Sequence, residues 1–411
     1  MKITDIQAIE VIDSRGNPTV RAFITLDDTS THVASVPSGA STGAHEAVEL
    51  RDNDANRFLG KGVLQAVKNV NTTIRDTLVN TEIDPNTIDE KLIALDGTPN
   101  KGNLGANALL AVSQAAVRAR AHAENKSLWR FMNEYYFNKK TVSFPRLLVN
   151  IVNGGKHASW NFDIQEFMIV PNTNIPSDSV RIATEIFHSL GKLLHERNLS
   201  TLLGDEGGYS PATLSSNEEV LETIILAGKS AGYENGQDFR LSLDCAATEW
   251  FQNGQYISQK RNEEIPVEDL IQYYKGLTEK YQLLSIEDPL AEDDWENYKT
   301  LTRETDAIII GDDLFVTNPK RIKRGIKEKS ATAVLVKINQ IGTIKETAEA
   351  INMTHEAGWK TAISHRSGET EDSFIADLSY ACASEFIKAG SMARSERLAK
   401  YNRLLEIECN L

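Results

Sequence analysis

Apolar positions in the first third of the chain follow the spacing of short strands and then of helices. The predicted strands are residues 2–12, 19–26 and 32–37. Residues 14–18 contain the turn formers that join the first two strands. The clearest helical pattern covers residues 106–124, where apolar side chains recur every three or four positions. Strands followed by helices predict a small α+β domain, which we expect to span residues 1–138.

The rest of the chain, residues 139–411, repeats a different unit, in which a short apolar run ends in a polar residue. The six runs end at Asp244, Glu287, Asp312, Lys337, His365 and Lys388. After the first, the ends are about 25 residues apart, which is room for a strand, a loop and a return helix. Helical patterns at 218–231 and 343–357 fill two of the gaps. This rhythm predicts a (β/α) barrel or a doubly wound sheet, and a turn signal at 252–255 predicts a hairpin in the longer first gap.

The strand ends matter because a barrel brings the carboxyl ends of its parallel strands to one mouth, where such enzymes keep their chemistry. A single polar residue at a strand end is more often only the point where the strand meets water. Six in succession, ordered as three acids, a lysine, a histidine and a lysine, are harder to explain by solvation. The mouth is therefore the candidate active site.

Composition narrows the class of protein. A chain of 411 residues is too long to fold around one ordinary hydrophobic core, so two domains or a large barrel with an addition are expected. A formal charge of -14 argues against nucleic acid as a partner, because phosphate backbones bind basic surfaces. No apolar run approaches the roughly 18 residues that span a membrane, and we expect no secretory signal. Cys245, Cys382 and Cys409 are widely spaced and odd in number, which is typical of reduced thiols in a cytoplasmic protein.

Three of the strand ends, Asp244, Glu287 and Asp312, offer carboxylate oxygens. Such ligands with no cysteine or histidine nearby suit a hard cation such as Mg²⁺, and without a cation the three charges would repel one another. Asp288 and Asp313 directly follow two of these residues. Because alternate side chains of a strand face opposite ways, one acid of each pair should coordinate and the other should support the structure.

Two further residues could transfer protons. Most lysines are merely exposed, but Lys337 continues an apolar run, and burial with neighbouring cations would lower its pKa and make it a base. Glu206 lies in the glycine-rich segment 204–209. That segment is either a tight capped turn or a backbone that holds a carboxylic acid close to a ligand.

Other segments suit substrate binding. Residues 153–157 form a second glycine turn, and Glu166 lies in an apolar strand at 164–171. The Gly, Ser and Ala residues of 38–46 are typical of a loop that gates a site, although most such loops are only connectors. Arg366, with neighbouring hydroxyls at a strand end, suits a phosphate clamp.

Together these segments closely resemble the enolase family along nearly the whole chain. The matching segments, in the family's order, are DSRGNPTV (13–20), SGASTGAHEAVELRD (38–52), LGANALLAVS (104–113), IQEFMIVP (164–171), GDEGG (204–208), SIEDPL (285–290), GDDLFVTNP (311–319), LVKINQIGT (335–343), SHRSGETED (364–372) and ARSERLAKYN (393–402). The resemblance implies a magnesium-dependent lyase of glycolysis and gluconeogenesis that interconverts 2-phosphoglycerate and phosphoenolpyruvate.

The resemblance also implies a fold and an assembly. The expected fold is a helix-backed α+β domain followed by an atypical eight-stranded α/β barrel, TIM-like but starting ββαα before (βα)6. The expected assembly is a homodimer or a higher homo-oligomer, in the cytoplasm, with the secondary cell-surface or secreted pool that some family members have. One departure is Ala389, which follows Lys388 where many members carry Thr.

Residue roles follow from the same resemblance. Asp244, Glu287 and Asp312 would bind one Mg²⁺, and Ser41 would bind a second that is recruited with the substrate. Lys337 would be the base and Glu206 the general acid. The implied substrate-site residues are His157, Gln165, Glu166, Glu287, Asp312, His365, Arg366, Ser367 and Lys388.

Two other functions would fit parts of this sequence. Another enolase-superfamily enzyme, acting on a different acid, would share the fold and the carboxylates. The phosphate-suited segments 38–43 and 364–369 favour enolase over it. A non-catalytic binding protein is the second alternative, and its signature would be a missing ligand or base, whereas every such position carries the expected residue.

Overall fold

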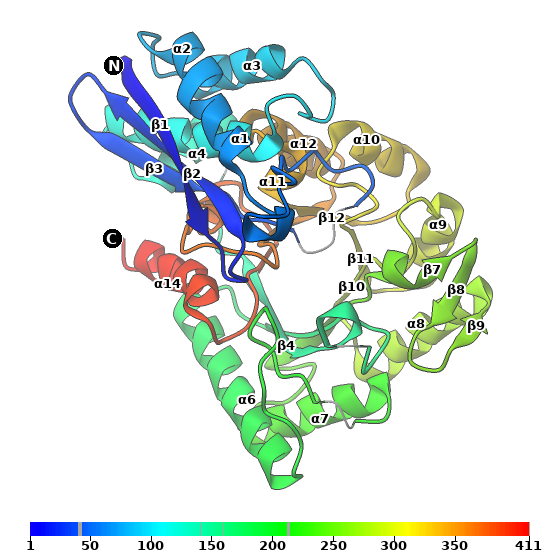
Figure 1. The fold of residues 1–411 in the computed structure, drawn as a ribbon. Coiled ribbons are helices and arrows are strands. Elements are labelled where there is room, and N and C mark those ends of the chain that lie inside the picture. Colours follow the sequence, from blue (N-terminus) through cyan, green and yellow to red (C-terminus); the bar gives the residue numbers. More distant parts are fainter. Residues whose placement is uncertain (40–42, 140, 159, 212–213, 411) are drawn as a thin grey trace.

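A meander of three antiparallel strands organises the N-terminal part of the molecule: β1 (Ile3–Ile12), β2 (Pro18–Leu26) and β3 (Thr31–Ser35). The computed structural model describes residues 1–39, 43–139, 141–158, 160–211 and 214–410. Side chains of β2 alternate between buried and partly exposed, as in a sheet with one covered face. The covering helix is α4 (Ala106–Ala123), whose many alanines let it approach β2 and β3 closely (Figure 1). These elements lie within two residues of their predicted positions.

Shorter helices complete this part of the chain. They are α1 (Leu64–Asn69), α2 (Arg75–Leu78), α3 (Pro85–Asp96) and α5 (Leu128–Tyr136), with a 3-10 turn, η1 (Phe58–Gly60), before α1 and a π-helical turn, η2 (Val70–Ile74), between α1 and α2. The helix α3 shows its start in the sequence: the Asp84 side chain accepts a hydrogen bond from the Thr87 amide, and proline occupies the first turn.

A closed barrel of eight strands forms the rest of the molecule. In chain order its strands are β4 (Arg146–Asn153), β5 (Glu166–Pro171), β6 (Phe239–Asp244), β10 (Ser285–Glu287), β11 (Ile308–Gly311), β12 (Ala333–Val336), β13 (Lys360–Ser364) and β14 (Phe386–Lys388). Each strand pairs with the next, and β14 closes on β4. All pairs are parallel except those of β5, which runs antiparallel to β4 and β6. The predicted α/β barrel that begins ββαα is confirmed.

The reversal of β5 follows from its connections. A short link with a 3-10 turn, η3 (Gly155–Ala158), turns the chain back from β4 into β5. Two packed helices, α6 (Pro176–Glu196) and α7 (Asn217–Ser230), then carry the chain out and back before β6 (Figure 1). As a result, the first residue of β5 lies at the same mouth as the last residues of the parallel strands.

The remaining helices surround the later strands. They are α8 (Val267–Tyr281), α9 (Trp295–Glu304), α10 (Pro319–Glu328), α11 (Ile338–Ile341), α12 (Ile344–Glu356), α13 (Phe374–Ala381) and α14 (Ser395–Glu408). Within the described ranges, none of the helices has both the length and the apolar character that crossing a bilayer requires.

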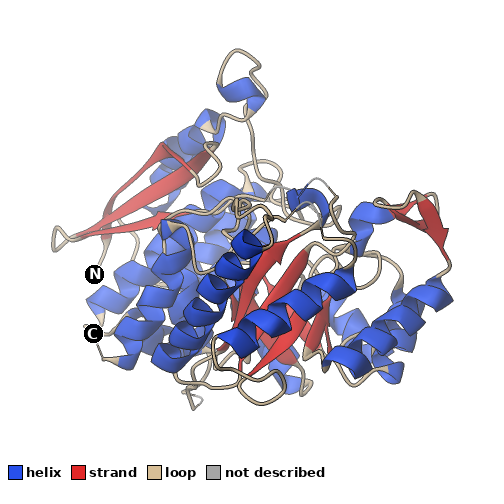
Figure 2. Cartoon of the chain, turned by 90° about the horizontal axis from the view of Figure 1, so that it is seen from below, coloured by secondary structure: helices blue, strands red, loops and turns tan. Residues whose placement is uncertain are grey.

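A small second sheet lies outside the barrel, in the long gap before β10. After a 3-10 turn, η4 (Ala247–Trp250), it consists of β7 (Phe251–Gln252), β8 (Gln255–Ser258) and β9 (Glu263–Ile265). The predicted hairpin at 252–255 is confirmed, with a third strand that the pattern did not indicate. This sheet and the N-terminal sheet lie on opposite sides of the barrel in both views (Figures 1 and 2).

The apolar core has two layers. Side chains that point into the barrel fill its centre, including Met168, Leu335 and Phe386, all fully buried. The opposite strand faces pack under the helices in a cluster that continues into the N-terminal part. Strands buried on both faces read as continuous apolar runs, which is why the sequence showed them as such.

The N-terminal helices also hold the barrel helix α12. Ser113 Oγ accepts a hydrogen bond from the Ile344 amide at 2.9 Å, and Asp89 Oδ2 accepts one from the Lys345 amide at 2.9 Å. These amides belong to the first turn of α12, where no intrahelical acceptor exists. The two parts are therefore joined through specific polar contacts next to the strand β12, which leads to Lys337.

Candidate active site

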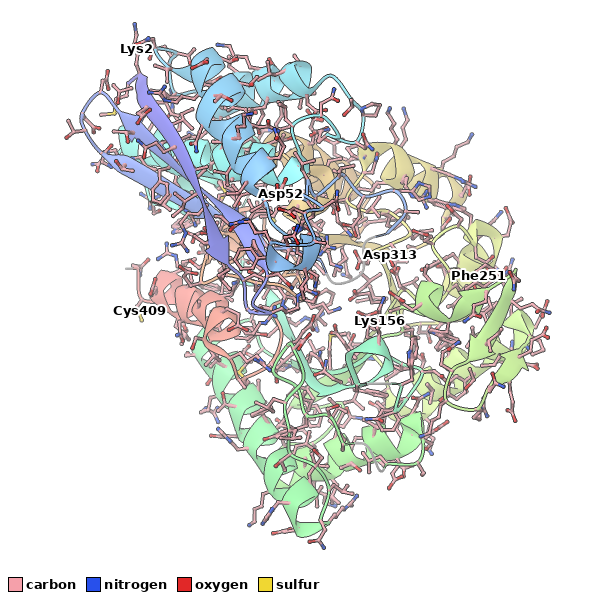
Figure 3. All side chains as sticks on the ribbon, viewed as in Figure 1. Lys2, Asp52, Lys156, Phe251, Asp313 and Cys409 are labelled. Atoms are coloured by element: carbon pink, nitrogen blue, oxygen red, sulfur yellow. The ribbon has the colours of Figure 1, made fainter. Side chains whose placement is uncertain are left out.

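Residues at the ends of several barrel strands line one small cavity of about 50 Å³. Glu287, which ends β10, does not line it but contacts Lys388, which does. Its lining residues are Gln165, Glu166, Glu206, Asp244, Ala246, Glu249, Asp288, Asp312, Asp313, Lys337, Ser364, His365, Arg366, Ser367 and Lys388. Most of the site residues predicted from the sequence are therefore brought together. Figure 3 looks toward this mouth, with Asp313 and Lys156 labelled beside it. Ser41 and the side chain of His157 lie outside the part of the chain that the structure describes.

Lys388 lies among the carboxylates on one side of the mouth. Its Nζ is 2.8 Å from Asp244 Oδ2, 2.9 Å from each Glu287 oxygen and 3.3 Å from Glu166 Oε2. Burial disfavours the charged lysine, but these acids outweigh burial and raise its pKa well above the ordinary value. The surrounding acids therefore favour the charged form of Lys388.

Lys337 pairs with Asp312 on the other side. Its ammonium group is in close contact with Asp312 Oδ2, and Gln340 Nε2 donates to Asp312 Oδ1 at 2.8 Å. Burial, the largest single influence, disfavours the charged form of Lys337, but Asp312, Asp313 and Glu287 together outweigh it and raise the Lys337 pKa above the usual range. The prediction that burial and nearby cations lower the Lys337 pKa is therefore wrong when only the protein's own groups act on it, because the nearest charge is a carboxylate.

Asp288, the acid that follows Glu287, is engaged in hydrogen bonds to neighbouring groups. Asp288 accepts hydrogen bonds from the Asp312 amide at 2.9 Å, the Asp313 amide at 2.7 Å and the Tyr298 hydroxyl at 3.0 Å. Its oxygens are thus engaged in holding the loop after β11. Oxygens of Asp288, Asp312 and Asp313 also lie within 4.8 Å of one another, which is a second possible cation set. We favour the set of Asp244, Glu287 and Asp312 because the donors to Asp288 are two backbone amides and a buried tyrosine hydroxyl, which the fold fixes. Among the described residues, the carboxylate oxygens of Glu287 and Asp312 accept hydrogen bonds only from side chains.

The pKa shifts of the acids at the barrel mouth indicate whether a metal ion fits there. Burial and the nearby Glu206 raise the pKa of Glu166 well above its usual value, and burial with Asp244 does the same for Glu287. Such shifts arise where carboxylates have too little positive charge around them. The donors are oxygens, and divalent cations of the Mg²⁺ type prefer oxygen ligands. The site therefore fits a hard cation.

Glu206 lies beside two side chains, those of Asn150 and His365. Asn150 Nδ2 donates to Glu206 Oε2 at 3.2 Å, and His365 Nε2 lies 3.6 Å from the same oxygen. The glycine turn brings Glu206 this close because Gly207 has φ +86°, and a Cβ there would lie 2.7 Å from the Ala393 carbonyl oxygen. The glycine-rich segment is thus a close-approach turn.

Arg366 carries a fork of hydrogen bonds to the loop above the mouth. Its Nη1 lies 2.8 Å from Glu46 Oε2 and its Nη2 lies 3.2 Å from Glu46 Oε1, while Asn339 Oδ1 accepts a further bond at 3.1 Å. Glu46 Oε1 also accepts the Gly43 amide at 3.0 Å, and the Ala44 amide donates to Glu292 at 3.2 Å. The guanidinium is therefore aligned by the end of the 38–46 loop.

Some residues of the site were missed by reasoning from the sequence. Glu46 lies in a quoted motif, but nothing in its spacing indicated Arg366 as its partner, 320 positions away. Asn150 belongs to the first barrel strand, and an amide inside an apolar run carried the only available signal. Arg397 lies in the motif 393–402 and is fully buried. It was missed because a charged residue on a helix is normally exposed.

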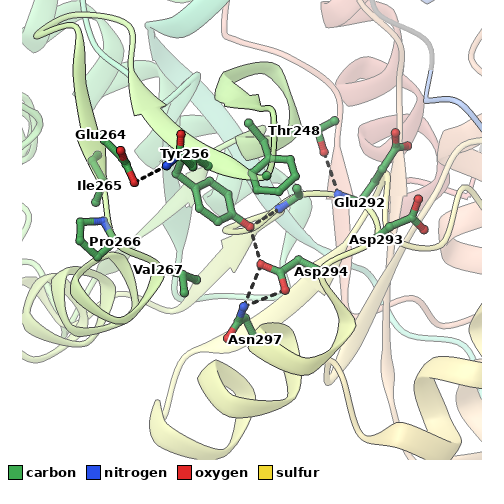
Figure 4. Close-up of a pocket in the computed structure, with 14 residues that line it drawn as sticks. Thr248, Tyr256, Glu264, Ile265, Pro266, Val267, Glu292, Asp293, Asp294 and Asn297 are labelled. Carbon is green, nitrogen blue, oxygen red and sulfur yellow. Dashed lines mark hydrogen bonds between the residues drawn. The ribbon is translucent and has the colours of Figure 1, made fainter.

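A larger cavity, about 610 Å³, lies between the small sheet and the loop before α9 (Figure 4). Its polar groups satisfy one another: the Tyr256 hydroxyl donates to Asp294 at 2.7 Å and accepts from the Ala291 amide at 2.9 Å, and Asn297 donates to Asp294 at 2.8 Å. Among the described residues, those that line this cavity include no lysine, arginine or histidine. The smaller cavity, with its opposed charges, is the candidate active site.

Comparison with known proteins agrees with this geometry. Residues 3–132 match the family model for the enolase N-terminal domain, and residues 141–411 match the model for the enolase C-terminal TIM barrel domain. A protein named enolase from Elusimicrobium minutum (strain Pei191) is 49% identical over 414 aligned residues, which cover 100% of this chain and 96% of that protein. The chain therefore belongs to the enolase family, the phosphopyruvate hydratases, and is a lyase.

Proposed function

We propose that this protein catalyses the reversible, Mg²⁺-dependent dehydration of 2-phosphoglycerate to phosphoenolpyruvate, as a step of glycolysis and gluconeogenesis. One observation carries the proposal: Lys337 and Glu206 line the same small cavity, together with a group of carboxylates and the guanidinium of Arg366. Removal of a proton next to a carboxylate, loss of a hydroxyl and recognition of a phosphate require a base, an acid and cations in such an arrangement.

The carboxylates of Asp244, Glu287 and Asp312 would hold the first Mg²⁺, and Ser41 would contribute to a second that arrives with substrate. When bound, the cation supplies positive charge against the enolate that develops and offsets the carboxylates that raise the Lys337 pKa. The protein contributes a fixed frame for these ligands. Asp244 ends β6, Glu287 ends β10, and the two are register partners in the barrel.

Lys337 is proposed to take the proton from C2 of the substrate. It follows β12, whose four residues are all buried, and its amide donates to Thr317 Oγ1 at 2.9 Å. The backbone therefore fixes the point from which the side chain enters the cavity. The like charge of Arg366 opposes the nearby acids that raise the Lys337 pKa, and so acts in favour of the neutral amine that a base requires.

Glu206 is proposed to protonate the departing C3 hydroxyl. The contact with Asn150 fixes one carboxyl oxygen, and His365 lies beside it. Glu166, whose raised pKa favours a protonated carboxyl, and Gln165 line the same cavity and would contact the substrate. His157 is proposed as a further contact from the turn after β4.

Phosphate recognition is assigned to Arg366 and Ser367, with Lys388 on the carboxylate side of the substrate. A planar guanidinium can hold two phosphate oxygens at once, and Glu46 and Asn339 keep this one oriented. An arginine fork at this position suits a phosphorylated substrate, and turnover of 2-phosphoglycerate against glycerate tests that preference.

We further propose that the protein acts in the cytoplasm as a homo-oligomer, with a possible secondary pool at the cell surface. Cys245 and Cys382 are buried and Cys409 is exposed, and no disulfide joins them, which suits a reducing compartment. Light scattering of the purified protein would report the oligomeric state directly.

The absorbance of phosphoenolpyruvate provides the test of function. Purified protein with 2-phosphoglycerate and Mg²⁺ should produce the signal, excess chelator should abolish it, and restored Mg²⁺ should bring it back. Glycerate without the phosphate serves as the matched substrate control and should give no turnover. Turnover of glycerate, or full activity in chelator, would contradict the proposal.

A further inference from the structure

Arg397, in the C-terminal helix α14, is fully buried although it carries a permanent charge. Its Nη1 lies 2.5 Å from His365 Nδ1 and 2.6 Å from the Arg366 carbonyl oxygen. Its Nη2 donates to the carbonyl oxygens of Ser367 at 2.6 Å and Asp205 at 3.3 Å. One side chain thus binds both the loop after β13 and the turn that carries Glu206.

The contact with His365 determines where that imidazole carries its proton. A guanidinium has only N–H donors and stays protonated at any relevant pH, so His365 Nδ1 must be the acceptor. A neutral imidazole with an acceptor at Nδ1 has its proton on Nε2, the nitrogen that lies 3.6 Å from Glu206 Oε2. An imidazolium would need a proton on Nδ1, where the guanidinium N–H already points.

We propose that Arg397 is a positioning residue that holds His365 as the neutral tautomer with its proton on Nε2, facing Glu206. The significance for catalysis rests on the proposed function, in which Glu206 gives its proton to the leaving hydroxyl. A neutral His365 leaves that carboxyl able to be protonated. A charged His365 would form an ion pair with Glu206 and stabilise the carboxylate, which has no proton to give.

Burial and the neighbouring cations also favour the neutral form of His365. Burial lowers the pKa of His365 most, Glu206 raises it, and Arg397, Lys388 and Lys400 lower it further. Lys400 is one helical turn beyond Arg397 and donates to Glu369 Oε2 at 2.8 Å, so α14 supports the same loop twice. The geometry and the surrounding charge therefore agree.

The tautomer can be observed in the unmodified protein. We would label histidine with ¹⁵N, identify the His365 signals by their loss in His365→Gln, and record ring nitrogen shifts between about pH 6 and pH 9. The expected result is an unprotonated Nδ1 and a protonated Nε2 throughout. A protonated Nδ1, or a titration of His365 within this range, would overturn the proposal. Because this readout needs no turnover, it stands apart from the test of the proposed function.

Variants then connect the tautomer to Arg397. Arg397→Met removes the donor, so His365 should begin to titrate, and kcat should fall by roughly ten- to hundredfold, most strongly at low pH. Arg397→Lys keeps a charged donor and should restore the pH-independent nitrogen shifts, at least in part. Arg403→Lys is the matched control, because Arg403 lies on the same helix and pairs with Asp377. If Arg397→Met leaves the His365 shifts and the pH profile unchanged, the role of Arg397 is purely structural and the proposal is wrong. If Arg397→Met does not fold, the nitrogen shifts of Arg397→Lys and of the unmodified protein test the proposal instead.

Discussion

Glu166 lies directly opposite Asp244 in the pairing of β5 with β6, although Glu166 begins its strand and Asp244 ends its own. This register exists because β5 runs antiparallel to its neighbours. In a regular parallel barrel the first residue of a strand lies at the end away from the active site. The reversed strand therefore adds a buried acid to the barrel mouth that holds the candidate active site, 3.3 Å from Lys388.

Substitution of the metal ligands should distinguish the two possible cation sets. Asp244→Asn should weaken Mg²⁺ binding by more than the roughly 10- to 100-fold that outer contacts of a metal site typically contribute, because it removes a proposed ligand. Asp313→Asn should have a much smaller effect, because Asp313 belongs only to the alternative set. Calorimetric titration of Mg²⁺ without substrate measures both. A loss confined to Asp313→Asn would move the site to Asp288, Asp312 and Asp313.

Arg366→Lys should weaken phosphate recognition without weakening Mg²⁺ binding. Lysine keeps the charge and loses the fork, and loss of one hydrogen bond to a charged group costs about 1.5–3 kcal/mol, or roughly ten- to hundredfold in affinity. Titration with phosphoenolpyruvate and with inorganic phosphate as a competitor measures this loss.

The control for this prediction is Arg118→Lys, which breaks a comparable arginine fork between two residues that do not line the cavity. Arg118 binds both oxygens of Asp372, at 2.7 and 2.6 Å. Its replacement should affect stability but leave phosphate affinity unchanged. Equal affinities of the parent protein and Arg366→Lys would transfer the main phosphate contact to the 38–46 loop.

Asp89 should make stability depend on pH. Burial raises its pKa from 3.8 to about 7, and its Oδ1 has no hydrogen-bond partner among the described residues. A carboxyl whose pKa is raised by folding stabilises the fold fully below the unfolded pKa, and this stabilisation is lost as pH rises through the folded pKa. The free energy of unfolding should therefore fall between about pH 4 and pH 7, by up to about 4 kcal/mol from this group.

Asp89→Asn should remove that slope, since a neutral amide has no charge to desolvate. Urea unfolding curves of the two proteins should therefore diverge in favour of the variant as pH rises. Glu90→Gln, on the exposed side of the same helix, is the control and should diverge far less. Parallel curves for Asp89→Asn and the parent protein would show that Asp89 is not buried as a neutral acid.

The barrel and most residues of its mouth could be predicted from the sequence, because buried parallel strands are continuous apolar runs and their ends are polar. Strand β12 and the residue after it, Lys337, were predicted in this way. The strand β4 was missed, although it is almost fully buried, because its run is interrupted by Asn150 and ends without a charged residue.

Contacts between distant segments could not be predicted from local pattern. Arg397 reads as an exposed helical charge, and only the folded chain shows that helix α14 delivers it to His365. The charge state of Lys337 has the same origin. Its apolar neighbours in sequence indicated a lowered pKa, whereas its neighbour in space is Asp312, which raises it.

The central claim, that Lys337 removes the C2 proton while Glu206 serves the leaving hydroxyl, is tested most directly by exchange of the C2 proton of 2-phosphoglycerate with deuterated solvent. We predict that Lys337→Ala, with Mg²⁺ present, shows no exchange. Glu206→Gln should continue to exchange this proton while phosphoenolpyruvate formation falls by roughly a hundredfold or more. The opposite pattern, with exchange kept in Lys337→Ala and lost in Glu206→Gln, would contradict the assignment of the two residues.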